Sequence, residues 1–250
     1  MNRRMAIADR EEVYNAPIIP WNNGTYTPLA NSMVMDLIDT KINNLGLVVK
    51  DEYYKVTRTS DGLIKGVIGS YDISTPDGDY GQRVMFRNSY DKSMSFAFVC
   101  GMVVWICSNG CISGDYQYRR IHRGAFLEGT STTEKEVIAS VEGGFTVLQN
   151  SFEHTSEQLN ELKHFEVSPE EVFKILGTLF FTKQVINITQ MSIIKRELAS
   201  SQNFRHLGDL KFTAYDLYNH ITESLKTSHP TTYVNDHVVT HSLFEETFNL

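Results

Sequence analysis

The sequence predicts an α+β fold, in which an antiparallel β-meander of four or five strands packs with flanking helices and the C-terminal half is helical. Between about residues 50 and 123, β-rich runs alternate with short Gly- and Asn-containing separators that favour tight hairpins. After residue 130, apolar residues instead recur every three or four positions, which is typical of amphipathic helices. A chain of 250 residues, 41% of them hydrophobic, can bury a sizeable core.

The first 30 residues are expected to form an N-terminal arm. Residues 15–30 contain three prolines and an Asn-Asn-Gly, a composition that favours extended or looped chain. From Asn31 onward, apolar residues fall near helical spacing and Gly46 provides a natural stop. We therefore predict a helix over residues 31–45.

The stretch AFVCGMVVWICSNGCISG, residues 97–114, carries no charge and is expected to contain a buried strand. Its strongly apolar part runs from Phe96 to Cys107, well short of the roughly 20 residues that a membrane-spanning helix needs. Continuous apolarity without polar alternation is typical of a strand covered on both faces, so we place this strand in the middle of the sheet. Asn109 and Gly110 predict the turn that follows it.

A long helix is predicted to begin at Ser131-Thr-Thr-Glu134, whose spacing suits a capping box. Its heptad-like apolar seam, from Ile138 to Leu162, suits an intramolecular core and a subunit interface equally well, and Gly143-Gly144 lies inside it. Residues 229–250 form a C-terminal tail of mixed periodicity. We expect one α+β domain over residues 31–228, with three further helices that begin at SPEE (168–171), at about Thr189 and at residue 213.

Composition limits the classes of function. The formal net charge of −7 argues against a chain that coats nucleic acid or anionic membrane over its whole surface. Three clustered cysteines do not make the disulfide framework of a small secreted domain, and the N-terminal residues lack the apolar run of a signal peptide. We therefore expect a cytoplasmic protein that is not bound to a membrane.

The cysteines and histidines give little support for a metal or a cofactor. Cys100, Cys107, Cys111 and His122 form a three-cysteine, one-histidine set, but their spacing is poor for zinc, so buried structural thiols are the favoured interpretation. A nucleophilic Cys111 would need a base held beside its thiol, and nothing in the sequence fixes that arrangement.

Other motifs for catalysis are also weak. His237 and His241 in HVVTH lack the glutamate of HExxH and are expected to form a surface pair. No glycine-rich phosphate loop or nucleophile elbow is present. We assign no catalytic residue, no metal and no cofactor, and expect that the protein is not an enzyme.

The positive charge is concentrated in one segment. Residues 81–124 hold six Lys/Arg and two acids, so they carry +4 while the rest of the chain carries −11. Cations that follow phosphates, interleaved with rings that stack on bases, are typical of single-stranded nucleic-acid binding. A solvated face whose arginines pair with acid-rich helices is the open alternative. The candidate nucleic-acid-binding residues are Arg83, Arg87, Lys92, Arg119, Arg120 and Arg123 with Tyr90, Tyr116 and Tyr118.

Several blocks of the sequence resemble, in order, the phage/plasmid-like protein family catalogued as domain of unknown function 932. The blocks are GVIGSYDIS (66–74), residues 87–114, YRRIHRG (118–124) and AYDLYNHITESLKTSHP (214–230), and they cover about two-thirds of the chain. The matching positions are Gly66, Val67, Asn88, Ser89, Asp91, Ser93, Cys107, Asn109, Gly110, Arg120, His122, Gly124, Tyr218, Asn219, Thr222 and Glu223.

The resemblance implies a mobile-element protein in the cytoplasm of a bacterial host, without naming a reaction. The order helix, β-meander, helix is also similar to the core of phage single-strand annealing recombinases. We therefore expect a non-catalytic phage or plasmid protein that binds single-stranded DNA for annealing or protection, as a possible homo-oligomer. The alternative is an anti-defence or host-factor-binding protein that acts through protein–protein contacts.

Overall fold

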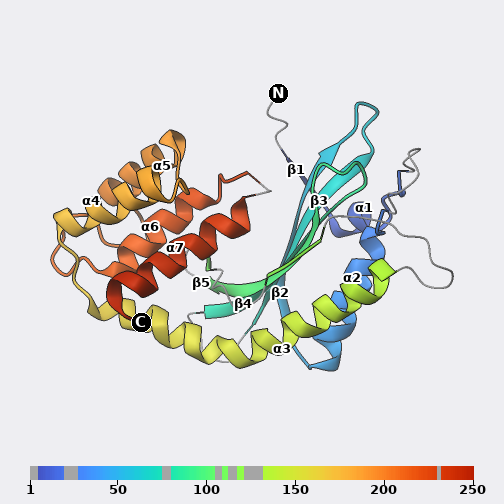
Figure 1. Cartoon of the computed structure of the whole chain (residues 1–250), viewed down its shortest axis with the longest axis horizontal. Helices are drawn as coiled ribbons and strands as arrows, with labels where there is room; N and C mark the ends of the chain where they lie inside the picture. The colour runs from blue at the N-terminus through green and yellow to red at the C-terminus, as the bar shows by residue number, and fades with distance from the viewer. Residues whose placement is uncertain are drawn as a thin grey trace. The chain divides into compact units, whose positions relative to one another are not determined.

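The structure is a computed structural model that describes residues 5–19, 28–74, 80–104, 109–111, 117–120, 132–229 and 232–250 (Figure 1). The chain divides into two compact units, although one domain was expected over residues 31–228. Unit 1 comprises Met1–Pro76, Gln82–Cys100 and Tyr116–Gln149, and unit 2 comprises Asp77–Gly81, Gly101–Asp115 and Asn150–Leu250.

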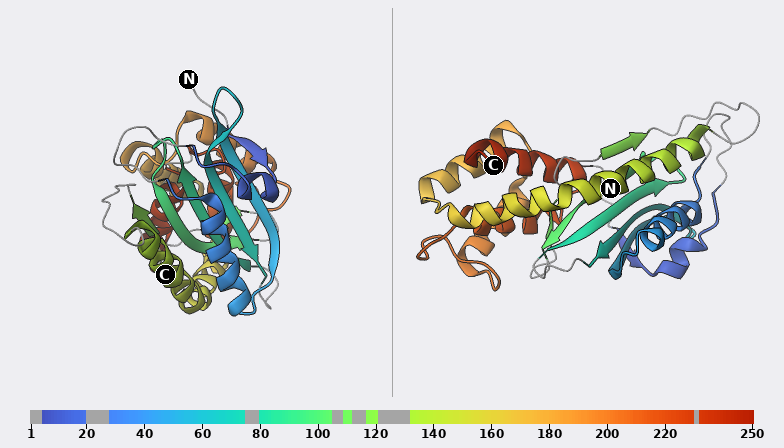
Figure 2. Two further views of the ribbon diagram at one scale, coloured as in Figure 1. Left: turned by 90° about the vertical axis from the view of Figure 1, so that its right-hand side faces the viewer. Right: turned by 90° about the horizontal axis from the view of Figure 1, so that it is seen from below.

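The predicted antiparallel meander is confirmed. The strands follow the order β1-β2-β3-β4-β5-β6, and β7 also pairs with β5. Neighbouring strands with a described register are antiparallel, and the ribbons of β2 to β5 show the twist of such a sheet (Figure 2). The strands are β1 (Ala6–Ala8), β2 (Val49–Arg58), β3 (Ile64–Ile73), β4 (Tyr80–Ser89), β5 (Phe96–Val104), β6 (Asn109–Cys111) and β7 (Gln117–Arg120).

Strand β5 is the central, buried strand that the sequence predicts. It lies between β4 on one side and β6 and β7 on the other, and residues 96–103 are all buried. The prediction of a turn at Asn109 and Gly110 is wrong, because both residues lie in β6 opposite Val104 and Val103. No helix in the described part of the chain is long and apolar enough to cross a membrane.

The N-terminal segment contains regular structure that the sequence pattern did not predict. Strand β1 pairs with β2, and helix α1 (Arg10–Tyr14) follows it. The Arg10 guanidinium donates to the Glu52 carboxylate (2.6 Å) and to Asp39, which ties this segment to β2 and to helix α2 (Asn31–Asn44). Residues 20–27 of the predicted arm lie outside the described residues.

Helices cover one face of the sheet in unit 1 (Figure 1). The predicted helix over residues 31–45 is confirmed as α2, and Gly46 follows it at φ +64°. Val137, Val141 and Phe145 of helix α3 (Thr132–Glu161) join the same core as α2 and the sheet. Ser131 of the predicted capping box lies outside the described residues.

Unit 2 is mostly helical, as predicted for the C-terminal half. Leu159 and Leu162 belong to its core, so the apolar seam of α3 supplies intramolecular core in both units. Residues 233–248, which the sequence pattern left unassigned, form a helix. The elements after α3 are η1 (Leu162–His164), α4 (Pro169–Gly177), η2 (Thr178–Thr182), α5 (Ile188–Ser200), α6 (Ala214–Leu225) and α7 (Tyr233–Phe248).

Helix α3 packs closely on β5 at Gly144. A Cβ atom at this position would lie 2.4 Å from Cε1 of Phe98 and 3.1 Å from Sγ of Cys100. Glycine usually destabilises a helix by about 1 kcal/mol relative to alanine, so its presence here is explained by the space it leaves for the strand. Gly177 in α4 is different, because a Cβ atom there would meet nothing within 4 Å.

We expect Gly144→Ala to lower the free energy of unfolding by about 1–3 kcal/mol, because the added methyl group overpacks the helix against Phe98. The matched variant Gly177→Ala should raise it by about 0.5–1 kcal/mol, because it gains helix propensity without a clash. Urea unfolding followed by circular dichroism measures both. Stabilisation by both substitutions would contradict the close packing at Gly144.

Candidate nucleic-acid interface

The two faces of the sheet differ in composition. In the β2–β3–β4 register, Tyr54, Gly69 and Phe86 are Cα partners. Tyr54 and Phe86 both belong to the core under α2 and α3. The adjacent row, Lys55, Ile68 and Arg87, therefore points to the other face, because successive strand residues alternate between faces. We call this second face the polar face.

The polar face carries four described rows. They are Thr57, Gly66 and Ser89; Lys55, Ile68 and Arg87; Tyr53, Ser70 and Met85; and Asp51, Asp72 and Arg83. Exposure is greatest on β2: Tyr53 is 41% exposed, whereas Met85 and Arg87 on β4 are 9% and 6% exposed. The accessible part of the described face is thus on β2.

Arg83, a predicted phosphate ligand, is held by a carboxylate. Its Nε and Nη2 donate to Oδ1 and Oδ2 of Asp72 at 2.5 and 2.7 Å. The two side chains are only 13% and 12% exposed. This bidentate ion pair joins β3 and β4 and balances the charge of Arg83. The pair fits the alternative interpretation, in which arginines of the basic segment pair with acids. The acid lies on a strand, however, and not on one of the acid-rich helices.

Arg87 also has a structural role. Its Nε donates to the Ser95 carbonyl at 3.2 Å and its Nη2 donates to the Ser95 hydroxyl at 2.9 Å. These bonds fasten β4 to the residue that precedes β5, and they leave Arg87 6% exposed as a whole residue.

Tyr90 is not at the surface. The residue is 1% exposed, its hydroxyl accepts a hydrogen bond from the Asn31 amide at 3.1 Å, and burial raises the pKa of its phenol. Asn88 supports the same region by donating to the Leu29 carbonyl (2.6 Å) and to Oδ1 of Asn31 (2.9 Å). A ring enclosed in this way has no face for a base to stack on, which corrects the predicted stacking role of Tyr90.

The turn after β4 explains several residues of the family pattern. The Ser89 hydroxyl donates to the Met94 carbonyl (2.8 Å) and accepts from the Met94 amide (3.0 Å). Asp91 accepts from the Ser93 amide (3.0 Å) and pairs with Lys65. Lys92, the remaining candidate on this segment, is exposed at φ +62° in the turn.

Of the remaining candidates, the structure describes Tyr118, Arg119 and Arg120. Strand β7 lies along β5, with Tyr118 opposite Phe98, Arg119 opposite Ala97 and Arg120 opposite Phe96. Tyr116 and Arg123 lie outside the described residues.

The sequence pattern did not single out Tyr53 and Lys55. The Lys55 ammonium lies 5.4 Å from the centre of the Tyr53 ring, an arrangement typical of a cation–π contact. Both residues precede the strongly basic segment, and only their spacing of two along a β-rich run indicates that they share a face.

The described residues contain no group of three or more His, Cys, Asp or Glu side chains that could hold a metal ion. Cys100 is buried in the apolar core, and burial raises the pKa of its thiol, as expected for a structural cysteine. Cys111 lies in β6, while Cys107 and His122 fall outside the described residues.

His237 and His241 were expected at the surface, and this is wrong. They are 0% and 1% exposed, because α7 packs against α6. His241 shares a 3.4 Å hydrogen bond between its Nδ1 and the Tyr218 hydroxyl, and the His237 ring lies 4.6 Å from the Tyr233 ring. The mixed periodicity of this segment concealed the helix.

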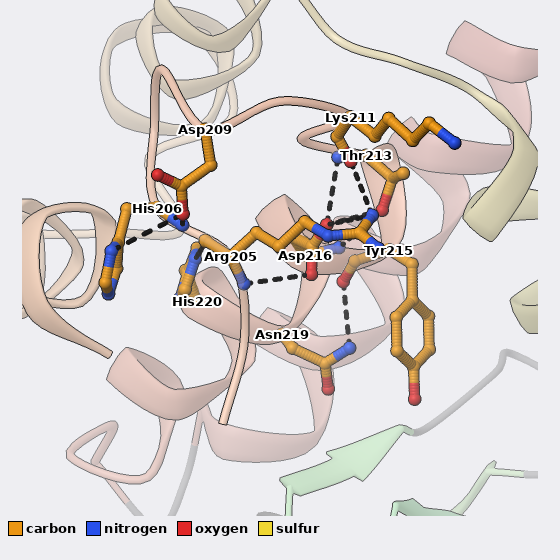
Figure 3. A network of polar contacts seen from close by, with 9 residues as sticks. All are labelled: Arg205, His206, Asp209, Lys211, Thr213, Tyr215, Asp216, Asn219 and His220. Atoms are coloured by element: carbon orange, nitrogen blue, oxygen red, sulfur yellow. Dashed lines mark hydrogen bonds and ion pairs between the residues drawn. The ribbon is translucent and has the colours of Figure 1, made fainter. Parts of the chain in front are cut away.

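Unit 2 contains a polar network that fastens the loop before α6 (Figure 3). The Arg205 amide donates to Asp216 (3.2 Å), and its guanidinium donates to the Lys211 carbonyl (2.6 Å). The Arg205 carbonyl in turn faces Nε2 of His220 at 2.8 Å. Since a carbonyl only accepts, Nε2 carries the proton of a neutral imidazole, and burial lowers the pKa of His220.

The fold and this site define a class: α+β proteins in which helices cover one face of an antiparallel sheet and the other face carries polar and charged side chains. A sequence model described as domain of unknown function (DUF932) matches residues 24–243. The chain belongs to this family, and the match extends beyond the blocks that carry the resemblance, into residues 24–45 and toward the C-terminus. No curated protein and no solved structure matches the chain.

We expect Tyr90→Phe to lower the free energy of unfolding by about 1–2 kcal/mol, because the buried Asn31 amide loses its acceptor. Tyr53→Phe, at an exposed position, should change it by less than about 0.5 kcal/mol. Urea unfolding compares the two variants. Equal stability of both would contradict a structural role for the Tyr90 hydroxyl.

We also expect stability to fall as the pH decreases from about 7 to about 5. The unfolded chain binds a proton at His220 near pH 6.5, whereas burial keeps the folded ring neutral to lower pH. One such proton contributes a slope of at most about 1.4 kcal/mol per pH unit. His220→Gln should reduce the slope, and His229→Gln, at an exposed position, should not. Identical slopes in wild type and His220→Gln would contradict the assignment.

Proposed function

We propose that this protein binds single-stranded DNA, for annealing or protection, and does not catalyse a reaction. The observation that carries the proposal is the segregation of the two sheet faces. One face gives its apolar side chains to the core, while the other carries Lys55 in the row next to the exposed ring of Tyr53. Cations beside accessible rings are the combination that single-stranded DNA requires.

The candidate residues divide into two roles under this proposal. Arg83, Arg87 and Tyr90 support the sheet, because their polar groups have protein partners and little exposure. The residues assigned to direct contact with DNA are Tyr53 and Lys55 on β2, exposed Lys92, and Arg119 and Arg120 on β7. Arg123, Tyr116 and Tyr118 stay candidates by sequence.

The proposal is tested by fluorescence anisotropy with labelled single- and double-stranded oligonucleotides at several salt concentrations. Wild type should prefer single strands. Arg119→Glu/Arg120→Glu should weaken binding at least about ten-fold and reduce the slope of log K against log salt by about 1.4, at about 0.7 for each phosphate that is no longer neutralised. The control Lys195→Glu/Arg196→Glu makes the same charge change at exposed positions of α5 and should have little effect.

Tyr53→Ala should weaken binding about ten-fold with no change in salt slope, because a stacked base contributes about 1–3 kcal/mol and the number of neutralised phosphates stays the same. If Arg119→Glu/Arg120→Glu left both the DNA affinity and the salt slope unchanged, β7 would not be part of the DNA interface. Failure of the wild type to bind either DNA at low salt would contradict the proposal and favour a host protein as the partner.

A further inference from the structure

Two phenylalanines of unit 2 are the most exposed aromatic side chains in the described part of the chain. Phe173 on α4 is 65% exposed and Phe181 on η2 is 76% exposed. Val172, Ile175 and Leu176 supply the buried side of α4, so neither ring is needed for the core. Exposed apolar side chains mark a binding surface where they lie together in one patch.

Helix geometry predicts that the π-turn after α4 brings Phe173 and Phe181 to one side of the helix. In a continuous α-helix, residues eight apart are offset by about 80°. The Lys183 amide instead donates to the Thr178 carbonyl at 2.8 Å, a five-residue step that closes a wider turn. Because a π-turn holds more residues than an α-turn, the eight residues from Phe173 to Phe181 span close to two full turns, and we expect Phe181 on the side of Phe173.

Gly177 lies midway between Phe173 and Phe181 in the sequence and adds no side chain there. A Cβ atom there would meet nothing within 4 Å. Eight residues rise by about 12 Å at most along a helix. Two bases stacked between two rings need three intervals of about 3.4 Å, or about 10 Å. The neighbouring Phe180 ring contacts Phe181 edge-on, with centroids 4.8 Å apart, and supports its orientation.

The charge beside the rings favours a nucleic acid over a protein. Lys174 and Lys183 are exposed, and neither forms an ion pair within 4.0 Å in the described ranges. Lysine is depleted at protein–protein interfaces, whereas it is an ordinary ligand of phosphate. The acids of the first turn are Glu170 and Glu171, and Glu171 accepts from the amide and hydroxyl of Ser168 in the helix cap.

We propose that Phe173, Gly177 and Phe181, flanked by Lys174 and Lys183, form a second binding site on unit 2, which stacks two adjacent bases of single-stranded DNA. This inference rests on the proposed function, and it adds a contact of a different kind from the sheet. The rings bind bases of any sequence, and the lysines bind the phosphates on either side of them.

The test uses the full chain and a 30-nucleotide oligo(dT) with two adjacent 2-aminopurines, whose fluorescence is quenched by stacking. Phe173→Ala/Phe181→Ala should weaken binding about a hundred-fold, about ten-fold for each ring, and should abolish the protein-dependent quenching. Lys174→Gln/Lys183→Gln should reduce the salt slope by about 1.4. The control Leu210→Ala, at an apolar position 88% exposed in the same unit, should change neither quantity.

The outcomes separate this inference from the proposed function. If wild type binds DNA and the β7 variant binds it weakly, but Phe173→Ala/Phe181→Ala keeps full affinity and quenching, the second site is overturned and the proposed function stands. If the aromatic variant changes only the molecular mass measured by light scattering, the rings form a protein interface and the inference is overturned. If wild type binds no DNA, both proposals fail together.

Discussion

The close packing of α3 against β5 at Gly144 is the constraint on which unit 1 depends. Because no side chain separates the helix from Phe98 and Cys100, the helix lies near enough for Phe145 to reach the same ring, with centroids 6.2 Å apart. The face of the sheet that the helix covers is thereby fixed as the apolar one. Because successive strand residues alternate between faces, Lys55 and Arg87 lie on the opposite face, independently of the hydrogen bonds that their side chains form.

Charge along the sequence and charge available at the surface are different quantities in this protein. The +4 of residues 81–124 includes Arg83, which Asp72 neutralises, and Arg87, which Ser95 holds in a buried position. Exposed cations instead occur at separate places, such as Lys92 in a turn and Lys174 on α4. A binding role therefore depends on which cations the fold leaves accessible to water, and a count of charged residues does not reveal this.

The elements were predictable where local chemistry decides them. Residues such as Ser168 and Thr213 start helices through reciprocal caps that leave a trace in the sequence, and the continuous apolarity of β5 indicated its central position. Long-range partners were not predictable. The buried Tyr90 hydroxyl accepts from the amide of Asn31, which is 59 residues away, and His241 is buried where α7 packs on α6. The exposure of Phe173 and Phe181 could not be foreseen either, because it depends on a π-turn with no clear sequence pattern.

Strand β1 has a consequence for solubility. An uncovered strand edge presents a row of amide and carbonyl groups that can template pairing with another chain. Three residues, Ala6–Ala8, occupy part of the β2 edge opposite Tyr54, Lys55 and Val56, and Arg10 anchors them through Glu52. A tag or truncation that displaces this short strand would uncover the edge, so aggregation of an N-terminally altered protein would reflect the exposed edge rather than a defect in the core.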